Sequence, residues 1–337
     1  MKDLTIIIPL YNKEKYVADA LDSVFNQKTD YTYNIIIADD CSTDRSLDIV
    51  REYSNKYPGV IKILESKKNQ KLFKNVIRAY SIIDTPYFCV LGPDDYWTDY
   101  LKIQKSLDYL SSHPQCTIYV TNTWVLCQDG TKSKYLKASA AQDSSFDDFI
   151  KGRAVVGNAL GSMMRNVVFK DGLPGKLCRE LTEEQQNCFR GDTFITAIHI
   201  HKGIAHYEPE CDAIYRITPE GIWQGMPLFD RYIFGAKIQL NLYEYFDNEY
   251  IDLLYMAKNF VSIAEHSLLS HTNTCDINAT KEKIKELVCL KNRIDLALML
   301  NKLAKQSNPP KLKKKTLIEK IQYKVWKHLN KKFDSHR

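Results

Sequence analysis

The chain has 337 residues, of which 44% are hydrophobic and 26% charged, a composition typical of globular proteins. The composition excludes disordered, collagen-like and disulfide-scaffold proteins, and the length suits one large domain or two modest ones. No apolar run approaches the roughly 18 residues that a transmembrane helix needs. The run at residues 4–10 is too short for a signal peptide. The nine cysteines form no C-x-x-C pair, so we expect reduced thiols in a cytoplasmic protein.

The net charge of +6 is distributed unevenly along the chain. Residues 309–337 contain ten Lys or Arg and two acidic residues, which gives this tail a charge of +8 and leaves −2 for the rest. The main body is therefore close to neutral, and the basic character belongs to the C-terminal tail.

The first third of the chain alternates short β-branched apolar runs with segments whose apolar residues recur at helical spacing. The expected elements are a strand at 4–8, a helix at 17–25, a strand at 34–38, a helix at 46–57, a strand at 60–64, a helix at 72–83, a strand at 87–91 and a helix at 100–112. Repeated strand–helix units predict an α/β fold with an open, mostly parallel sheet flanked by helices.

Beyond a further strand at 117–126 the pattern loosens. The remaining expected elements are a short helix at 193–201, a short strand at 213–217, a helical region at 228–305 and a final helix at 316–333. The sequence Asn-Pro-Pro at 308–310 breaks the helical region. The predicted organisation is a domain at 1–227, a helical extension at 228–308 and a basic amphipathic tail at 309–337.

Ligands of open parallel sheets bind beyond the carboxyl ends of the strands. Two of the loops expected there carry adjacent aspartates, at 39–40 and at 94–95. Neighbouring carboxylates repel each other, so such pairs favour a bound cation or a ligand rich in donors. Hard cations prefer carboxylate and phosphate oxygens. Asp94 and Asp95 are therefore candidate ligands of Mn²⁺ or Mg²⁺, with Asp95 preferred as the direct one.

The absence of glycine from the first strand-to-helix turn is equally informative. The first glycine of the chain is Gly59. A dinucleotide-binding turn and a Walker A loop both need glycines that let phosphates approach the backbone. Dinucleotide dehydrogenases and P-loop kinases are therefore excluded. A phosphatase with a nucleophilic aspartate after the first strand is also excluded, because Pro9 stands there.

These blocks together resemble family 2 glycosyltransferases of the GT-A fold. The blocks are Ile-Ile-Ile-Pro-Leu-Tyr-Asn at 6–12, Ile-Ala-Asp-Asp-Cys-Ser-Thr-Asp at 37–44 and Asp-Asp-Tyr-Trp at 94–97. The resemblance is strong over residues 1–112, weaker to about 225 and absent beyond. It implies inverting transfer of a sugar from a nucleoside diphosphate sugar to a hydroxyl of a growing surface glycan, such as a capsule or lipopolysaccharide.

The resemblance also implies where the donor binds. Pro9, Tyr11 and Asn12 match the loop that closes over the nucleoside. One carboxylate of the next pair would accept a hydrogen bond from a uracil ring, which points to a UDP-sugar. Asp40 is slightly preferred for this contact, and Asp39 remains an alternative.

Around the metal, the resemblance is less complete. Asp94 and Asp95 match the metal-binding aspartates, while Gly92 stands where many relatives have the first aspartate of a D-x-D motif. Arg216 and Trp223 resemble a later loop that covers the diphosphate. The position two residues after that arginine, where many relatives have a metal-binding histidine, is a threonine here.

The resemblance places the catalytic base at Asp192. From the residues alone, Asp192 is also a good N-cap for a helix that begins at residue 193. Glu183 and Glu184 are alternative bases. The pair His199 and His201 looks like a zinc motif, but residues two apart on a helix face different sides, which favours a structural role.

Two other functions compete with the transferase. A sugar-1-phosphate nucleotidylyltransferase shares the fold, but it needs a glycine-rich first loop that this chain lacks. A membrane-tethered module that binds nucleotide sugars without transferring them is compatible with the aspartate pairs alone. Release of nucleoside diphosphate in the presence of an acceptor separates an enzyme from such a module.

The tail predicts an amphipathic helix, with apolar residues every four positions and lysines around much of the remaining circumference. It can lie on an anionic membrane through residues 311–333, or pack on its own domain with a solvated basic face. Lipid-linked acceptors, which this family often uses, favour a peripheral position on the inner face of the cell membrane. No nucleic-acid-binding fold is recognisable, so nucleic acid is not an expected partner.

Overall fold

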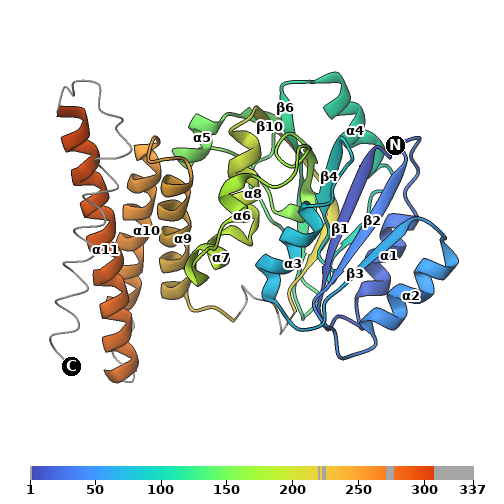
Figure 1. The fold of residues 1–337 in the computed structure, drawn as a ribbon, viewed down its shortest axis with the longest axis horizontal. Coiled ribbons are helices and arrows are strands. Elements are labelled where there is room, and N and C mark those ends of the chain that lie inside the picture. The colour runs from blue at the N-terminus through green and yellow to red at the C-terminus, as the bar shows by residue number, and fades with distance from the viewer. Residues whose placement is uncertain (1, 219–220, 222–224, 271–276, 307–337) are drawn as a thin grey trace.

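The structure, a computed structural model, describes residues 2–218, 221, 225–270 and 277–306 (Figure 1). Its strands are β1 (Leu4–Leu10), β2 (Tyr33–Asp39), β3 (Ile61–Glu65), β4 (Tyr87–Val90), β5 (Tyr96–Trp97), β6 (Cys116–Leu126), β7 (Lys132–Lys134), β8 (Gln142–Ser144), β9 (Ser162–Arg165) and β10 (Ile204–Arg216). The predicted strands of the first third are confirmed. The strand expected at 213–217 is much longer than predicted, because β10 begins at Ile204.

The helices predicted at 17–25, 46–57, 72–83, 100–112 and 193–201 are confirmed with small shifts of their ends, whereas the short helices at 146–150, 175–178 and 183–189 were not predicted. The helices are α1 (Val17–Phe25), α2 (Ser46–Lys56), α3 (Lys71–Tyr80), α4 (Lys102–Ser112), α5 (Phe146–Ile150), α6 (Gly175–Cys178), α7 (Glu183–Phe189), α8 (Asp192–Ile200), α9 (Leu228–Tyr245), α10 (Ile251–Ser270) and α11 (Ile277–Gln306), with a 3₁₀ turn at Ala159–Gly161. The helical region predicted at 228–305 is therefore divided into α9, α10 and α11. The helix predicted at 316–333 lies outside the described residues.

One sheet forms the centre of the N-terminal part. Its strand order is β3-β2-β1-β4-β9-β6-β10-β5, with β7 paired to β6 and β8 to β10. Strands β1 to β4 are parallel where they pair with one another, and β10 is parallel to β6. The short β9 runs antiparallel between β4 and β6. The predicted open, mostly parallel sheet is confirmed.

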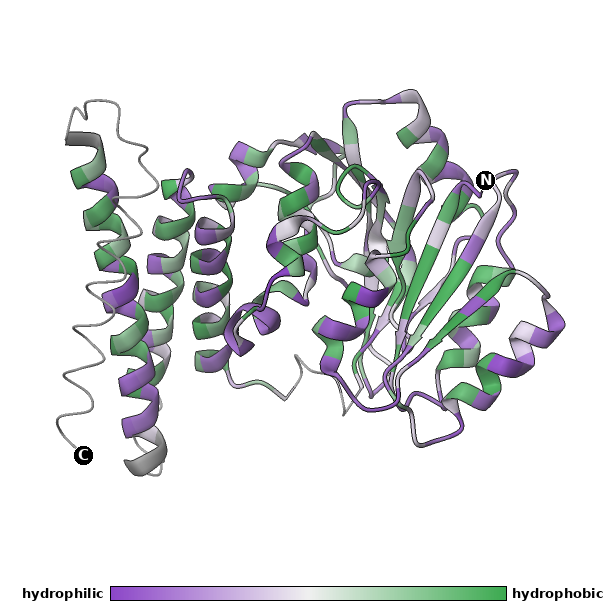
Figure 2. Cartoon of the chain, in the orientation of Figure 1, coloured by the Kyte–Doolittle hydropathy of each residue, from purple (hydrophilic) through white to green (hydrophobic). Residues whose placement is uncertain are grey.

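Side chains of β1 alternate between two hydrophobic clusters, one on each face of the sheet. Ile6 and Ile8 pack with residues of α1, α2 and α4, whereas Ile7 packs with residues of α3, α7 and α8. All three isoleucines are fully buried. Figure 2 shows the hydrophobic colour running along these strands. Burial on both faces explains the unbroken apolar runs in the sequence.

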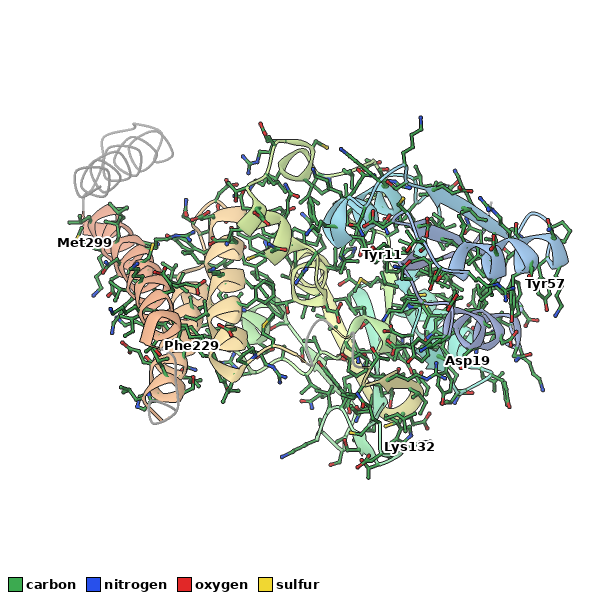
Figure 3. The ribbon with its side chains drawn as sticks, turned by 90° about the horizontal axis from the view of Figure 1, so that it is seen from below. Tyr11, Asp19, Tyr57, Lys132, Phe229 and Met299 are labelled. Atoms are coloured by element: carbon green, nitrogen blue, oxygen red, sulfur yellow. The ribbon has the colours of Figure 1, made fainter. Side chains whose placement is uncertain are left out.

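The helical extension packs on the face that carries α7 and α8. One continuous cluster includes Phe194 of α8, Leu240 of α9, Leu254 of α10 and Leu290 of α11. In Figure 1 these last three helices stand beyond α7 and α8, away from α1 and α2. Figure 3 correspondingly shows Met299 of α11 far from the N-terminal loops.

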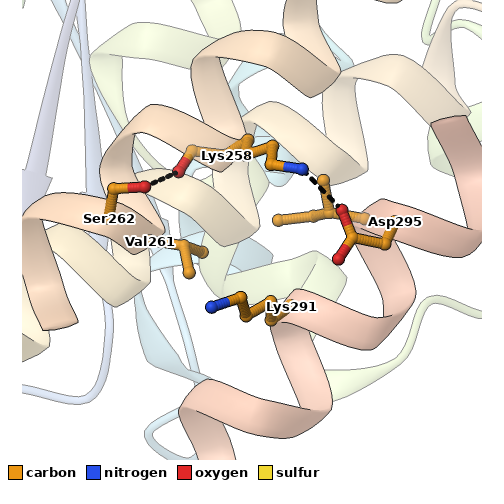
Figure 4. Close-up of a pocket in the computed structure, with 6 residues that line it drawn as sticks. Lys258, Val261, Ser262, Lys291 and Asp295 are labelled. Carbon is orange, nitrogen blue, oxygen red and sulfur yellow. Dashed lines mark hydrogen bonds and ion pairs between the residues drawn. The ribbon is translucent and has the colours of Figure 1, made fainter.

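A small pocket lies between α10 and α11 (Figure 4), two helices that stand away from β1 to β4 in Figure 1. The Nζ atom of Lys258 on α10 lies 2.8 Å from Oδ1 of Asp295 on α11 across this pocket, and Lys291 lines it as well. Ion pairs that are about half exposed, as these are, contribute little to stability. The pocket is thus lined by side chains at the contact between α10 and α11.

An ion pair buried in the domain joins α4 to β10. The Nζ atom of Lys102 donates to both oxygens of Asp212, at 2.9 and 2.8 Å, and to Oγ1 of Thr121 at 2.9 Å. Lys102 is 1% exposed and Asp212 is 5% exposed. The carbonyl of Asp212 accepts a hydrogen bond from the amide of Thr98 at 2.7 Å. The ion pair and this backbone bond therefore connect α4, and the segment between β5 and α4, to β10.

Replacing Lys102 with methionine should destabilise the protein by about 3–5 kcal/mol, because it leaves the Asp212 carboxylate buried without a counter-charge. Urea unfolding of wild type and variant measures this difference. The double variant Lys102→Met/Asp212→Leu removes both charges and should recover most of the loss. Exposed ion pairs contribute up to about 1 kcal/mol. A free energy of unfolding of Lys102→Met that differs from wild type by no more than this would contradict a buried pair.

The eight cysteines in the described part of the chain are free. Within the same residues, none of the helices combines the length and the apolar character that spanning a membrane requires.

Candidate active site

The loops singled out by the sequence meet at one edge of the sheet. In the parallel register, Leu10 of β1 pairs with Asp39 of β2, and Ile7 of β1 pairs with Val90 of β4. The amide of Asp40 donates to the carbonyl of Leu10 at 2.9 Å. The strands therefore end side by side, and the loops that follow them face the same side of the molecule.

Asn12 joins the first two of these loops. Its amide oxygen accepts a hydrogen bond from the backbone of Thr43 at 2.8 Å, and its own backbone N–H donates to Oγ of Ser42 at 3.1 Å. The φ angle of Asn12 is 50°, a left-handed conformation that asparagine adopts more readily than most residues. Pro9 belongs to the end of β1, and Tyr11 between them is 44% exposed. The loop thus presents an aromatic ring from a fixed backbone.

The Asp39–Asp40 pair is buried and bonded to backbone amides. Oδ2 of Asp39 accepts from the amides of Cys41 and Ser42 at 3.1 and 3.2 Å. Oδ1 of Asp40 accepts from the amide of Gln70 at 2.7 Å. Asp39 is thus committed to the turn of its own loop, whereas Asp40 links this loop to the one before α3.

Asp94 and Asp95 lie just beyond β4. Asp95 is 6% exposed, and its Oδ1 accepts a hydrogen bond from the amide of Arg216 at 2.9 Å. Burial, with the charge of Asp94 adding to it, raises the pKa of Asp95 to about 8. A Cβ at Gly92 would lie 2.6 Å from Oδ2 of Asp95. In this chain the Asp95 carboxylate therefore fills the space that a side chain at residue 92 would need.

Arg216, at the end of β10, contacts this aspartate loop and α1 together. Its Nη1 donates to the carbonyl of Asp94 at 3.3 Å, and its Nη2 lies 2.5 Å from Oδ2 of Asp19. Its guanidinium carbon lies 4.4 Å from the ring centre of Tyr96 and 5.5 Å from that of Tyr16. The sequence indicates Arg216 as a site residue but not Asp19 or Tyr16, since nothing in the sequence links α1 to β10.

Lys13 is a second cation that the sequence analysis missed. Its Nζ lies 2.8 Å from Oδ2 of Asp94, and both side chains are largely buried. Its place directly after Asn12, in the loop beyond β1, was the available signal. Lys13 and Arg216 together set two positive charges beside the carboxylates.

The structure corrects the position of Asp192 in its helix. Helix α8 begins at Asp192 and its N-cap is Gly191, so the N-cap interpretation is wrong. Oδ2 of Asp192 instead accepts a hydrogen bond from the amide of Ala159 at 2.9 Å. The side chain is exposed, yet the protein around it desolvates the carboxyl group and raises its pKa. The charge of Asp192 also contributes to the raised pKa of Asp95, so the two carboxylates lie within electrostatic reach.

The alternative base Glu184 is engaged elsewhere. Its Oε1 accepts from Nη1 of Arg293 on α11 at 2.9 Å and from the Asn241 side chain on α9 at 3.2 Å. Glu183, its neighbour, is exposed. Glu184 therefore serves contacts with the helical extension.

The histidine pair has a structural role, as predicted. His199 is fully buried, its Nδ1 lies 2.8 Å from the carbonyl of Ile195, and burial lowers its pKa to about 4. Nε2 of His201 lies 2.8 Å from the hydroxyl of Tyr250. The two rings face different partners. Trp223 lies outside the described residues.

The site residues fit a hard divalent cation. Among the described residues, no group of three or more His, Cys, Asp or Glu side chains could hold a metal. Asp94 and Asp95 are adjacent, and burial together with the charge of Asp94 raises the pKa of Asp95. Such a pair fits a cation such as Mn²⁺ or Mg²⁺ that takes its remaining ligands from phosphate oxygens and water.

Comparison with known proteins agrees with the geometry. Residues 5–169 match the family model described as glycosyl transferase family 2. An uncharacterized protein of Mycobacterium tuberculosis is 30% identical over 221 residues, which cover 65% of this chain and 60% of that protein. The putative teichuronic acid biosynthesis glycosyltransferase TuaG of Bacillus subtilis is 28% identical over 154 residues, 45% of this chain and 58% of TuaG. The chain thus spans about three fifths of the length of these relatives.

Solved structures share the fold. Residues 1–349 of Staphylococcus aureus TarS, in complex with UDP-GlcNAc, align with a TM-score of 0.61 at 16% identity, over 87% of this chain and 81% of that one. The mannosyltransferase PcManGT of Pyrobaculum calidifontis, in complex with GDP-Man and Mn²⁺, aligns with a TM-score of 0.53 at 13% identity, over 91% and 90%. The predicted GT-A fold is confirmed, and residues 5–169 match the model of glycosyl transferase family 2.

Proposed function

We propose that this protein is an inverting, metal-dependent glycosyltransferase that moves a sugar from a UDP-sugar to a hydroxyl of a cell-surface glycan. The observation that carries the proposal is the arrangement of Asp94, Asp95 and Arg216 at the carboxyl edge of the sheet, with Asp192 within electrostatic reach. The match to glycosyl transferase family 2 supports the reaction class. The similarity to TuaG, a putative teichuronic acid biosynthesis glycosyltransferase, supports a cell-wall acceptor.

In this proposal the donor lies along the loops beyond β1, β2 and β4. The exposed ring of Tyr11 covers the base. Asp39 binds two amides of its own loop, whereas the bond from the Gln70 amide goes to Oδ1 of Asp40, so we assign the hydrogen bond from the base to Oδ2 of Asp40. Asp94 and Asp95 would hold Mn²⁺ or Mg²⁺, and the cation would supply positive charge to offset the charge of the departing diphosphate. Arg216 lies beside this pair and adds a fixed positive charge.

Asp192 acts on the acceptor side. Its raised pKa makes it a stronger base than an ordinary aspartate once it has lost its proton. It takes the proton of the acceptor hydroxyl while the hydroxyl oxygen forms a bond to the anomeric carbon. The bond from that carbon to the diphosphate breaks on the opposite face. One displacement inverts the configuration, so an α-linked donor yields a β-linked product.

Release of nucleoside diphosphate tests this function. The purified protein is incubated with UDP-GlcNAc, UDP-glucose, dTDP-rhamnose or GDP-mannose, with Mn²⁺ and a cell-wall glycan extract. We expect acceptor-dependent release of the diphosphate from one donor and transfer of its sugar to the extract. Binding of a donor without release in any extract would favour the binding module.

We further propose that the protein works at the inner face of the cell membrane, where a lipid-linked acceptor is available. The support is the sequence of residues 311–333, which lie outside the described residues and combine apolar positions with lysines. Deleting residues 309–337 should abolish sedimentation with anionic liposomes at low salt and leave donor binding intact. If the full-length protein does not sediment with these liposomes, the alternative of a tail packed on its own domain holds.

A further inference from the structure

Lys13 has a fixed backbone and a long side chain directed at the aspartate pair. Its amide donates to Oγ of Ser46 at 2.7 Å, and its carbonyl accepts from the amide of Val17 at 3.0 Å. Its Nζ lies 2.8 Å from Oδ2 of Asp94 and 5.9 Å from the ring centre of Tyr16. The Lys13 side chain is 16% exposed and that of Asp94 21% exposed. This is a mostly desolvated ion pair at the centre of the candidate site.

The other charges of the site are balanced in the same way. The Arg216 guanidinium is paired with Asp19, and its backbone amide binds the Asp95 carboxyl group. Each side chain that would attract a cation or a phosphate therefore already has a partner within the protein. A divalent cation at Asp94 and Asp95 would lie close to the Lys13 ammonium group, and two positive charges close together repel each other strongly.

We propose that Lys13 occupies Asp94 in place of the divalent cation while the site is empty, and transfers to the diphosphate when metal and nucleotide enter together. The side chain suits this exchange, because a lysine carries its charge on a flexible four-carbon stem. The diphosphate supplies the negative charge that replaces Asp94 as its partner. This inference rests on the proposed function.

The exchange makes metal and nucleotide binding cooperative. Metal alone must break the Lys13–Asp94 pair without providing the ammonium group with a new partner, so it binds weakly. When nucleotide and metal bind together, the Lys13–Asp94 pair is broken only once. Asp94 then has the metal as its partner, and the Lys13 ammonium group has the diphosphate. The two ligands then strengthen each other's binding by the same factor, as linkage requires.

The variant Lys13→Met tests the exchange, because methionine keeps much of the length and removes the charge. Calorimetry measures Mn²⁺ binding with and without UDP, and UDP binding with and without Mn²⁺. Compared with wild type, we expect the variant to bind Mn²⁺ alone about tenfold more tightly and UDP at saturating Mn²⁺ about tenfold more weakly. The factor by which UDP strengthens Mn²⁺ binding should fall to about a tenth, within the usual range of coupling.

Lys15→Met is the matched control, since Lys15 is exposed in the same loop. It should leave all these affinities unchanged. If Lys13→Met shifts the affinities but leaves the coupling factor at the wild-type value, Lys13 is a fixed charge and the exchange is wrong. Unchanged Mn²⁺ affinity overturns the inference as well. A wild-type protein that binds neither Mn²⁺ nor UDP, dTDP or GDP overturns the proposed function itself, which separates the two failures.

Discussion

Replacing Asp95 with asparagine is expected to reduce turnover by at least about a hundredfold, because a metal that offsets charge on a leaving group contributes several kcal/mol to the transition state. Excess EDTA should abolish the activity of the wild type, and Mn²⁺ or Mg²⁺ should restore it. The exposed Asp84, in the loop before β4, provides the matched control. Asp84→Asn should retain wild-type turnover. Full activity in EDTA would contradict the metal assignment.

The raised pKa of Asp95 adds a pH signature. In the metal-free protein this carboxyl group keeps its proton up to about pH 8, so a cation must displace the proton. Affinity for Mn²⁺ should therefore rise as the pH approaches 8 and level off above it. Between the ordinary pKa of aspartate and 8, the folded protein holds this proton and the unfolded chain does not. The free energy of unfolding of the metal-free protein should thus decrease as pH rises through that window, and Asp95→Asn should remove this decrease.

Asp192→Asn should reduce turnover by roughly 10²–10⁴-fold, the usual contribution of a general base. Asparagine keeps an oxygen that can accept the hydrogen bond from Ala159, so thermal stability should hardly change. Donor binding should persist, since the base acts on the acceptor. Because the pKa of Asp192 is raised, wild-type kcat/KM should decline as pH falls through a value above that of an ordinary aspartate. Turnover at several pH values measures both effects.

The alternative base supplies the control for this experiment. Glu183 is exposed at the start of α7, and Glu183→Gln should keep turnover and stability close to wild type. If Asp192→Asn retains near-normal turnover while Glu183→Gln loses it, the base is Glu183. Glu184 is a poor control, because its loss would disturb the contact with Arg293.

The sequence was sufficient to predict the parallel half of the sheet and the loops beyond it. Strands buried on both faces leave unbroken apolar runs, as at Ile6 to Ile8, and the carboxyl ends of parallel strands must lie together. The aspartate pairs could therefore be placed at one edge without coordinates. The short β7, β8 and β9 were missed, since strands of three or four residues carry too little pattern.

Interactions across the fold were beyond prediction for a different reason. The pairing of Lys102 with Asp212 joins residues 110 positions apart, and that of Asp19 with Arg216 joins residues 197 apart. In the sequence each of these is an ordinary charged residue. The N-cap interpretation of Asp192 failed because the sequence does not show which residue begins the helix. An aspartate at the first helical position looks the same in the sequence as an aspartate at the N-cap.

The continuous cluster between the sheet domain and α9–α11 has a consequence for how the chain can be divided. Phe189 and Phe194, which flank Asp192 in the sequence, both lie against the ring of Tyr245 on α9, at 5.8 and 5.1 Å between centroids. A chain shortened at residue 227 would leave these two rings, next to Asp192 in the sequence, facing water. Helices α7 and α8 are therefore held in place partly by α9, and an exchange of the extension between relatives would need to carry α7 and α8 with it.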